Sequence, residues 1–211
     1  MQQVETKERE QGFKAVDVVI LPPEEISNLA ISLSEKLNDS PIVLNNKDLL
    51  PHITLAMGYI VDQEEVEKIL AKIAASTQLF DVVIEKIERT TQPYEGYYFS
   101  HLVIKNERPI QQLHERLVDS LPFVTPTTFS QKAFVVEEDE EIIRSTLEYT
   151  ARFKSASSHE KYWPHTTVGA GTNDLSVTNL PLTFRVDQIT LCQMGNFNTC
   201  CKVLGQWRLK S

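Results

Sequence analysis

The sequence predicts a mixed α+β fold in two halves, each of which contains one strand with the same short motif. The motif reads Pro-His-x-Thr followed by an aliphatic residue. It occurs over residues 51–58 and 164–171, in both cases with a Gly six positions after the His. Segments rich in β-branched residues alternate with segments of helical periodicity along the rest of the chain. With 211 residues, 41% of them hydrophobic and 24% charged, the composition is that of a globular protein with a substantial core.

The first part of the chain is expected to alternate two strands with two helices. Residues 13–21 are apolar and β-branched, which is typical of a buried strand, and a pair of prolines ends the run. Residues 24–38 have apolar side chains at helical spacing and acidic residues in the first turn, where the helix dipole favours them. After the motif strand over 51–58, a second helix over 62–76 begins at Asp62, whose carboxylate is a suitable N-cap.

The rest of the chain is expected to add more strands and two further helices. Residues 80–89 alternate well enough for a strand, and residues 97–104 follow after a turn, so these two strands should pair as a hairpin. Residues 107–121 have helical periodicity and tolerate Pro109 in the first turn. The remaining predicted elements are a short strand over 134–136, a helix over 138–153, the motif strand over 164–171, and closing strands over 182–191 and 200–209.

The motif places one His and one Thr on the same side of each strand. Residues two apart on a strand project from the same face, so His52 and Thr54 should point together, and so should His165 and Thr167. At about 3.3 Å of rise per residue, each His lies roughly 6–7 Å from its Thr along the strand. One phosphate-sized group is therefore within reach of both side chains of a pair.

These residue types suit the cleavage of a phosphodiester without a metal. An imidazole titrates near neutrality, so one His can take a proton from the attacking water while the other protonates the leaving oxygen. The two Thr hydroxyls can donate hydrogen bonds to the non-bridging phosphate oxygens. A single His-x-Thr on a strand is more often structural, but this motif is repeated with the same preceding Pro, following aliphatic residue and Gly. The repeat therefore favours the functional interpretation.

Two His-x-Thr motifs, each on a predicted strand, resemble the 2H phosphoesterase superfamily, which includes bacterial 2'-5' RNA ligase-like proteins and cyclic nucleotide phosphodiesterases. The resemblance covers residues 13–210. It implies a two-lobed, duplicated architecture in which each lobe is a mainly antiparallel sheet with helices packed outside. One motif strand per lobe then faces a central cleft. It also implies a single bilobal domain over residues 13–211, preceded by a polar and disordered tail over residues 1–12.

The expected site has a paired core and four outlying candidates. His52 and His165 are the expected general acid and general base, in either order, and Thr54 and Thr167 are the expected phosphate-binding residues. The outlying candidates are an aromatic pair on which a base could stack and two cations that could compensate phosphate charge, namely Tyr162, Trp163, Lys161 and Lys132. Two alternatives remain open: Trp163 packs against the interface of the lobes, and the lysines have ordinary surface positions.

Other residues with reactive side chains are expected to be structural. His101 and His114 have no partner motif around them, so both are interpreted as structural or surface residues. Cys192, Cys200 and Cys201 fit neither a disulfide framework nor a zinc pattern, and they are expected to be buried as small hydrophobic residues. No metal and no cofactor is expected.

The charge of the chain favours small ligands. The formal net charge is −8 and no run of Lys and Arg appears, whereas proteins that grip long nucleic acids present a basic stripe. The expected partner is a small nucleotide or a short oligonucleotide, without stable binding of long nucleic acid. No apolar run has the length of a membrane span and no secretory signal is evident, and three cysteines without a disulfide framework indicate a reducing compartment. A monomeric, cytoplasmic protein is therefore expected.

The two motifs predict a metal-independent phosphoesterase, and the resemblance to the 2H superfamily implies that it hydrolyses 2',3'-cyclic phosphate or 2'-5' phosphodiester bonds. One alternative is 2'-5' RNA ligase activity, which uses the same groups in the reverse direction. Another is a module of the same fold that binds such ligands without turnover. The third is an unrelated α/β protein in which the two repeats are only strand-forming segments.

Overall fold

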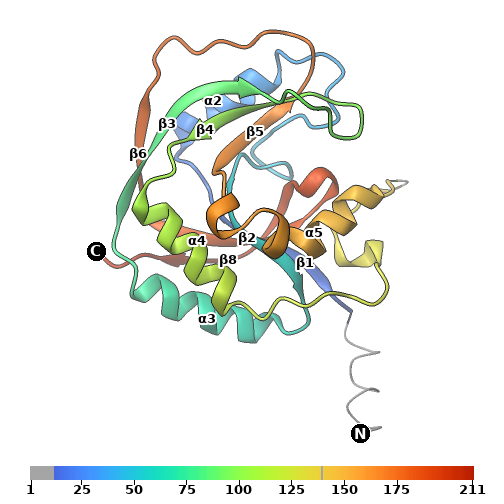
Figure 1. Ribbon diagram of the computed structural model, residues 1–211, viewed down its shortest axis with the longest axis vertical. Coiled ribbons are helices and arrows are strands. Elements are labelled where there is room, and N and C mark those ends of the chain that lie inside the picture. Colours follow the sequence, from blue (N-terminus) through green and yellow to red (C-terminus); the bar gives the residue numbers. More distant parts are fainter. Residues whose placement is uncertain (1–11, 139) are drawn as a thin grey trace, which may run out of the picture.

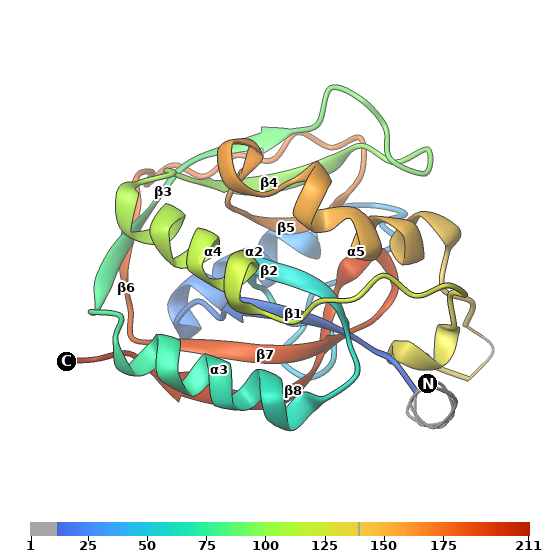
Figure 2. The same ribbon diagram turned by 60° about the horizontal axis from the view of Figure 1, so that its bottom comes forward.

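The computed structural model describes residues 12–138 and 140–211, which fold into two four-stranded antiparallel sheets with helices packed against them (Figure 1). The strand orders are β2-β1-β7-β8 and β5-β4-β3-β6. Figure 2 shows the two sheets as separate layers, with β3, β4 and β5 in one and β1, β7 and β8 in the other. The mixed α+β, two-lobed prediction is confirmed. The predicted tail falls almost entirely on residues 1–11, outside the described residues.

In the first sheet, the buried strand β1 lies next to the first motif strand. β1 is buried from Ala15 onward, which is why its sequence is apolar almost without interruption. It pairs on one side with β2, which begins directly after His52, and on the other side with β7. The strands of this sheet are β1 (Lys14–Ile20), β2 (Ile53–Ile60), β7 (Gln188–Met194) and β8 (Cys200–Arg208).

The second sheet contains the predicted hairpin and the second motif strand. β3 and β4 pair antiparallel as expected, and β4 pairs on its other side with β5, which starts at His165. The strands of this sheet are β3 (Phe80–Arg89), β4 (Phe99–Ile104), β5 (His165–Ala170) and β6 (Leu182–Val186). β5 is therefore an edge strand of its sheet, as β2 is of the first sheet.

The expectation that the chain divides into two consecutive halves is wrong. Residues 182–191, predicted as one strand, form two strands in different sheets: β6 pairs with β3, and β7 pairs with β1. The chain changes sheet at Asp187, and its last two strands return to the sheet formed by its first two (Figure 1). An apolar run with period two does not reveal this change, because both segments bury one face against a core.

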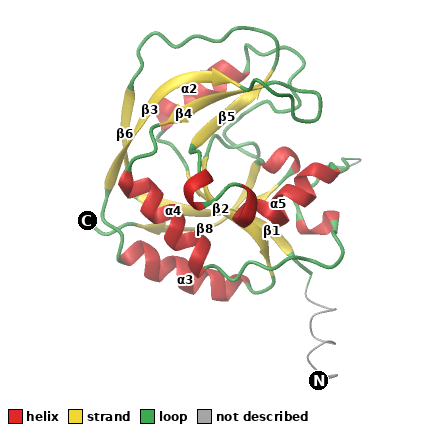
Figure 3. Ribbon diagram, in the orientation of Figure 1, coloured by secondary structure: helices red, strands yellow, loops and turns green. Residues whose placement is uncertain are grey.

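In the described part of the chain, four α-helices cover the sheets (Figure 3). Asp62 caps its helix as predicted, with its carboxylate accepting the Glu65 N–H at 3.0 Å. The helix predicted over 138–153 begins only at Arg144, and residues 134–136 form no strand, although the Val135 N–H donates to Met194 O. The helices are α2 (Glu24–Ser34), α3 (Gln63–Ala75), α4 (Arg108–Ser120) and α5 (Arg144–Ala156).

The packing of the helices links the two sheets. α4 and α5 contact β2, and α3 contacts β8, all in the first sheet. α2, however, contacts β5 in the second sheet although it follows β1 directly in the chain. The two motif strands β2 and β5 also contact each other. None of the helices in the described part of the chain is long and apolar enough to cross a membrane.

Candidate active site

The two motif pairs lie on the wall of one cavity between the sheets. His52 and Thr54 come from the edge strand β2 and the residue before it, and His165 and Thr167 come from the edge strand β5. All four side chains line a cavity of about 410 Å³. This volume is in the range of sites that hold small organic ligands.

Both motif histidines are held in the same way. Nδ1 of His52 lies 2.8 Å from Leu50 O, and Nδ1 of His165 lies 2.8 Å from Trp163 O. Because a carbonyl oxygen only accepts hydrogen bonds, each Nδ1 carries a proton and donates it. Each Nε2 is then left as the nitrogen that can exchange a proton with a ligand.

Burial makes both imidazoles weak bases. It lowers the pKa of His52 from its ordinary value, and the hydrogen bond to Leu50 only partly opposes this effect. It lowers the pKa of His165 to about 4, against the effect of its hydrogen bond to Trp163 and with a contribution from the nearby His52. In the free protein near neutral pH, both rings are therefore predominantly neutral.

Asp17 is a component of the site that the repeated motif does not reveal. It lies on β1, its side chain is fully buried, and its Oδ2 accepts the Thr54 hydroxyl at 2.6 Å. The same Oδ2 lies 3.8 Å from His52 Nε2. Burial raises the pKa of Asp17 well above its ordinary value, although the hydrogen bond from Thr54 works in the opposite direction. The signal in the sequence is an acidic residue within an otherwise apolar strand, which is rare without a function.

His101, interpreted as structural or surface, is buried in the same cavity wall. Its Nδ1 lies 3.1 Å from the Thr167 hydroxyl, and its ring centroid lies 4.5 Å from that of His165. Its position follows from the register of β4 and β5, which places His101 opposite Thr167. Burial, with a contribution from His165, lowers the pKa of His101 to about 2, so this ring is neutral.

The aromatic candidates of the sequence have different environments. The Tyr162 ring stacks on His114 with a centroid distance of 3.8 Å, and its hydroxyl donates to Thr54 O at 2.9 Å, so it supports β2 from behind. Trp163 is 43% exposed, and its ring centroid lies 4.3 Å from that of His165. Both residues line the cavity, but Trp163 offers the more accessible ring.

The two candidate lysines are separated by the fold. Lys161 lines the cavity and its Nζ donates to Ser155 O at 2.9 Å. Lys132 lies in a short 3₁₀ turn (Gln131–Ala133) and is not among the residues that line the cavity. Within the described residues, Lys161 is the one Lys or Arg of the cavity wall.

Further aromatic side chains line the cavity away from the histidines. Phe99 makes tilted or edge-to-face contacts with Tyr94 and Phe197, with centroid distances of 6.3 Å and 6.1 Å. Phe197 lies in the turn between β7 and β8 and has a left-handed backbone conformation, with φ of 53°. The three rings line the cavity and give it an apolar wall suited to a flat aromatic ligand.

The expectation of unpaired cysteines is wrong for two of the three. Cys192 and Cys200 form a disulfide across the β7–β8 hairpin, and Cys201 remains free. The hairpin brings the two Cα atoms to 5.7 Å, and a separation of eight residues does not predict this without the register of the strands. The inference of a reducing compartment, which rested on unpaired thiols, loses that support.

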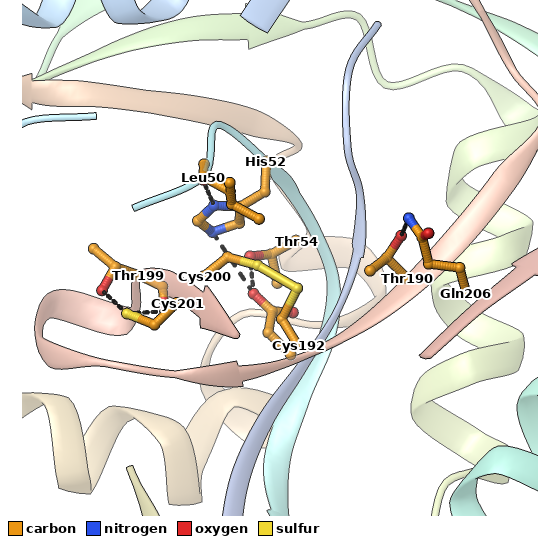
Figure 4. The surroundings of a disulfide bond; sticks show 10 residues. Leu50, His52, Thr54, Thr190, Cys192, Thr199, Cys200, Cys201 and Gln206 are labelled. Carbon is orange, nitrogen blue, oxygen red and sulfur yellow. Dashed lines mark hydrogen bonds and ion pairs between the residues drawn. A yellow bond between two sulfur atoms is a disulfide. The ribbon is translucent and has the colours of Figure 1, made fainter. Parts of the chain in front are cut away.

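The disulfide is close to the first motif. The Leu50 N–H donates to Cys200 O at 3.0 Å, and Leu50 O in turn accepts the hydrogen bond from His52. Figure 4 shows the disulfide between Cys192 and Cys200, and the ring of His52 directed to Leu50. Within the described residues, no group of three or more His, Cys, Asp or Glu side chains is arranged to hold a metal ion.

Comparisons with known proteins identify the family. A sequence model described as the 2'-5' RNA ligase superfamily matches residues 22–196. No curated protein sequence matches the chain. Solved structures with a similar fold include E. coli LigT complexed with NADP+, with a TM-score of 0.53 and 16% identity over 95% of this chain and 100% of that one. The protein TT0787 of Thermus thermophilus has a TM-score of 0.56 and 12% identity over 93% of this chain and 98% of that one.

A third similar structure is described as a phosphoesterase, with a TM-score of 0.53 and 16% identity over 95% of this chain and 100% of that chain. The structural likeness extends over nearly the whole of both chains, so it includes both sheets and both motif strands. Since the superfamily model covers most of the sequence, the resemblance found in the two His-x-Thr motifs is confirmed. The chain belongs to the 2'-5' RNA ligase superfamily, whose members are 2H phosphoesterases.

Proposed function

We propose that the protein hydrolyses 2',3'-cyclic phosphate or 2'-5' phosphodiester bonds in nucleotides or short oligonucleotides, by acid–base catalysis without a metal. The observation that carries the proposal is the meeting of two His–Thr pairs, from the edge strands of two sheets, in one cavity of about 410 Å³. Each pair combines an imidazole that has a free Nε2 with a hydroxyl two residues further along the strand.

The proposed reaction is a direct attack of water on phosphorus. One imidazole accepts a proton from water at Nε2 while the water oxygen forms the new P–O bond. The other imidazole is already protonated at Nε2. It donates its own proton to the ribose oxygen while the bond between that oxygen and phosphorus breaks. Thr54 and Thr167 bind the non-bridging oxygens, which carry negative charge throughout. The products are a phosphomonoester and, for a 2'-5' bond, a second fragment with a free hydroxyl.

The cavity wall supports a nucleotide as the substrate. Tyr94, Phe99, Phe197 and the exposed ring of Trp163 offer apolar faces on which a base can stack. Lys161 supplies one positive charge in a chain with a net charge of −8, which favours ligands with few phosphates. The structural neighbour LigT has been observed with NADP+, ATP and 3'-AMP, all of which are small nucleotides.

The proposal is tested by ³¹P NMR of a panel of 2',3'-cyclic nucleotides and 2'-5' dinucleotides, incubated with the protein in EDTA. The expected result is conversion of at least one substrate to a phosphomonoester, with one ¹⁸O atom in the product phosphate when the water is H₂¹⁸O. A protein that is inert toward the whole panel in EDTA, or active only after a divalent metal is added, would overturn the proposal.

A further inference from the structure

Asp17 is a buried carboxyl group without a cationic side chain to neutralise it. It lies on β1, between β2 and β7, and its exposed fraction is zero. Among the described residues, the one basic group within 4 Å of it is His52, with 3.8 Å between Nε2 and Oδ2. Oδ1 is buried and has no hydrogen-bond partner there. An ionised carboxylate in such a place has a large desolvation cost.

The hydrogen bond from Thr54 to Asp17 conflicts with phosphate binding when Asp17 is ionised. A Thr hydroxyl has a single proton, and a carboxylate can only accept it. When Thr54 donates to an ionised Asp17 at 2.6 Å, it presents only lone pairs to the cavity. A phosphate oxygen would then meet an acceptor, with a second negative charge behind it. A neutral Asp17 carboxyl, in contrast, can donate to Thr54 and free the hydroxyl proton for the phosphate.

We propose that Asp17 is a positioning residue that holds a proton whenever a phosphate group occupies the cavity, so that Thr54 donates to the phosphate and not to Asp17. The inference rests on the proposed phosphate-binding role of Thr54 and adds a residue outside the two motifs. Because a phosphate group and an ionised Asp17 repel each other, binding of the phosphate favours protonation of Asp17. Affinity for a phosphate ligand therefore decreases as the pH rises through the titration of Asp17.

Among the groups that face Asp17, His52 is the one whose charge can change without a strongly alkaline pH. Thr54 on β2 does not titrate, and Cys192, opposite Asp17 on β7, is in the disulfide. Tyr149 on α5 and Tyr162 beyond the 3₁₀ turn His159–Lys161 are close enough to sense the charge of Asp17. Burial raises the pKa of both phenols, so they stay neutral. Burial also raises the pKa of Asp17, which agrees with a neutral carboxyl.

The test uses Asp17→Asn, whose amide has the shape of a neutral carboxyl and can donate to Thr54. We would measure the binding of 3'-AMP to wild type and variant by calorimetry between pH 5 and 9. The matched control is Asp39→Asn, which removes the same charge from an exposed loop residue away from the cavity. The phosphate of 3'-AMP titrates as well, but it does so identically in all titrations, so the comparison of variants isolates Asp17.

The expected result is that Asp17→Asn binds 3'-AMP at least as tightly as wild type at every pH. Its advantage should grow with pH toward about tenfold per pH unit, the limit for one linked proton. Asp39→Asn should follow wild type. Thr54→Val should bind 3'-AMP about tenfold more weakly than wild type. In the Thr54→Val background, Asp17→Asn should increase the affinity for 3'-AMP by less than it does in the wild-type background.

Binding that is tenfold or more weaker in Asp17→Asn than in wild type would overturn the inference, because it would mean that the ionised carboxylate is required, as a partner of protonated His52. The absence of 3'-AMP binding by wild type would overturn it as well. The proposed hydrolysis is tested separately by the ³¹P panel. Binding with the predicted pH trend but no turnover would refute the hydrolysis alone, and turnover without that trend would refute the role of Asp17 alone.

Discussion

The two motif histidines have equivalent positions, whereas the two motif threonines have different partners. Each His is fixed by the carbonyl two residues before it, so the two halves of the site repeat each other at this level. Thr54 contacts a buried carboxyl, Asp17, and Thr167 contacts a buried imidazole, His101. The cavity wall is therefore symmetric in how the two motif histidines are held and asymmetric in the groups behind the two motif threonines.

The pH dependence of hydrolysis follows from the burial of the two imidazoles. Paired acid–base catalysis needs one neutral and one protonated ring, so kcat/KM is highest between the two pKa values of the free protein. Burial lowers both pKa values from the ordinary 6.5, that of His165 to about 4. We expect the optimum of kcat/KM below pH 6.5, measured on a 2',3'-cyclic nucleotide in buffers of constant ionic strength. An optimum above pH 7 would contradict this account of the histidines.

Asp17 also has a consequence for stability. Its pKa is raised in the folded protein, so above about pH 4, the ordinary value, the unfolded chain releases a proton that the folded protein retains. The unfolded state then binds fewer protons, and Asp17 makes the protein less stable as the pH rises through its folded pKa. Asp17→Asn should therefore gain stability over wild type by about 1.4 kcal/mol for each pH unit above about 4, until the folded pKa of Asp17 is reached.

The measurement is urea unfolding of wild type and Asp17→Asn from pH 4 to 8. The buried histidines act in the opposite direction, because their lowered pKa values make both proteins less stable as the pH falls below 6.5. The effect of His101 and His165 is common to the two proteins. His52 lies 3.8 Å from Asp17, but above pH 6.5 it is neutral in both proteins, so there the difference in the free energy of unfolding reports Asp17. A difference that shrinks as the pH rises would show that the carboxylate is stabilised in the folded protein.

At the level of residues, the motif predicts which side chains share the face of one strand, but not which side chains of other strands they contact. His52, Thr54, His165 and Thr167 are identified because strand alternation fixes which side chains share a face. Asp17 and His101 come from neighbouring strands, and their contacts with the threonines depend on strand order and register, which the sequence does not specify. The fold also decides between the two candidate lysines: Lys161 lines the cavity, whereas Lys132 lies outside the cavity wall.

At the level of elements, the first motif strand depends on the Gly that closes the motif. A Cβ at Gly58 would lie 2.5 and 2.6 Å from two atoms of the Phe123 ring, so an Ala there displaces the ring. We expect Gly58→Ala to lower the free energy of unfolding by about 1–3 kcal/mol, the usual cost of overpacking. Gly12→Ala is the control, since nothing lies within 4 Å of its added Cβ. Equal stability of the two variants would show that the contact with Phe123 is not restrictive.

The β7–β8 hairpin should depend on its disulfide. The bond between Cys192 and Cys200 closes a short loop and packs with the buried Val19 and the partly buried Leu21 and Leu50. For a loop of about nine residues, the loss of the cross-link should reduce the free energy of unfolding by about 2–3 kcal/mol. Urea unfolding with and without dithiothreitol measures this loss. Cys201→Ser, which leaves the bond intact, should respond to the reductant as wild type does, and the double variant Cys192→Ala/Cys200→Ala should not respond.

The prediction of elements from the sequence is correct where local chemistry decides and wrong where the chain changes sheet. The Asp62 N-cap and the β3–β4 hairpin depend on neighbouring residues, and both are as predicted. Residues 182–191 read as one strand because both parts alternate with the same period, so the change of sheet at Asp187 has no local signature. The late start of α5, at Arg144, was missed because the acidic segment before it also suits the first turn of a helix.

At the level of the whole molecule, the cavity exists because the two sheets meet along their motif edges. The first sheet combines both ends of the chain, and the second is formed by the middle, so the two His-x-Thr strands approach each other only after the chain has crossed between sheets. The duplication visible in the sequence therefore predicts two lobes and a shared site. It does not predict that the strands of one lobe come from both ends of the chain.

The most direct test of the paired-histidine mechanism is the rate of hydrolysis in EDTA of a substrate that the wild type cleaves in the ³¹P panel. The rate is measured for His52→Ala, His165→Ala and the control His159→Ala. The account predicts that each motif variant loses at least about 100-fold in kcat, the usual contribution of a general acid or base. His159, which lies outside the cavity wall, should be replaceable without such a loss. If either motif variant keeps wild-type turnover, the two histidines do not form the catalytic pair.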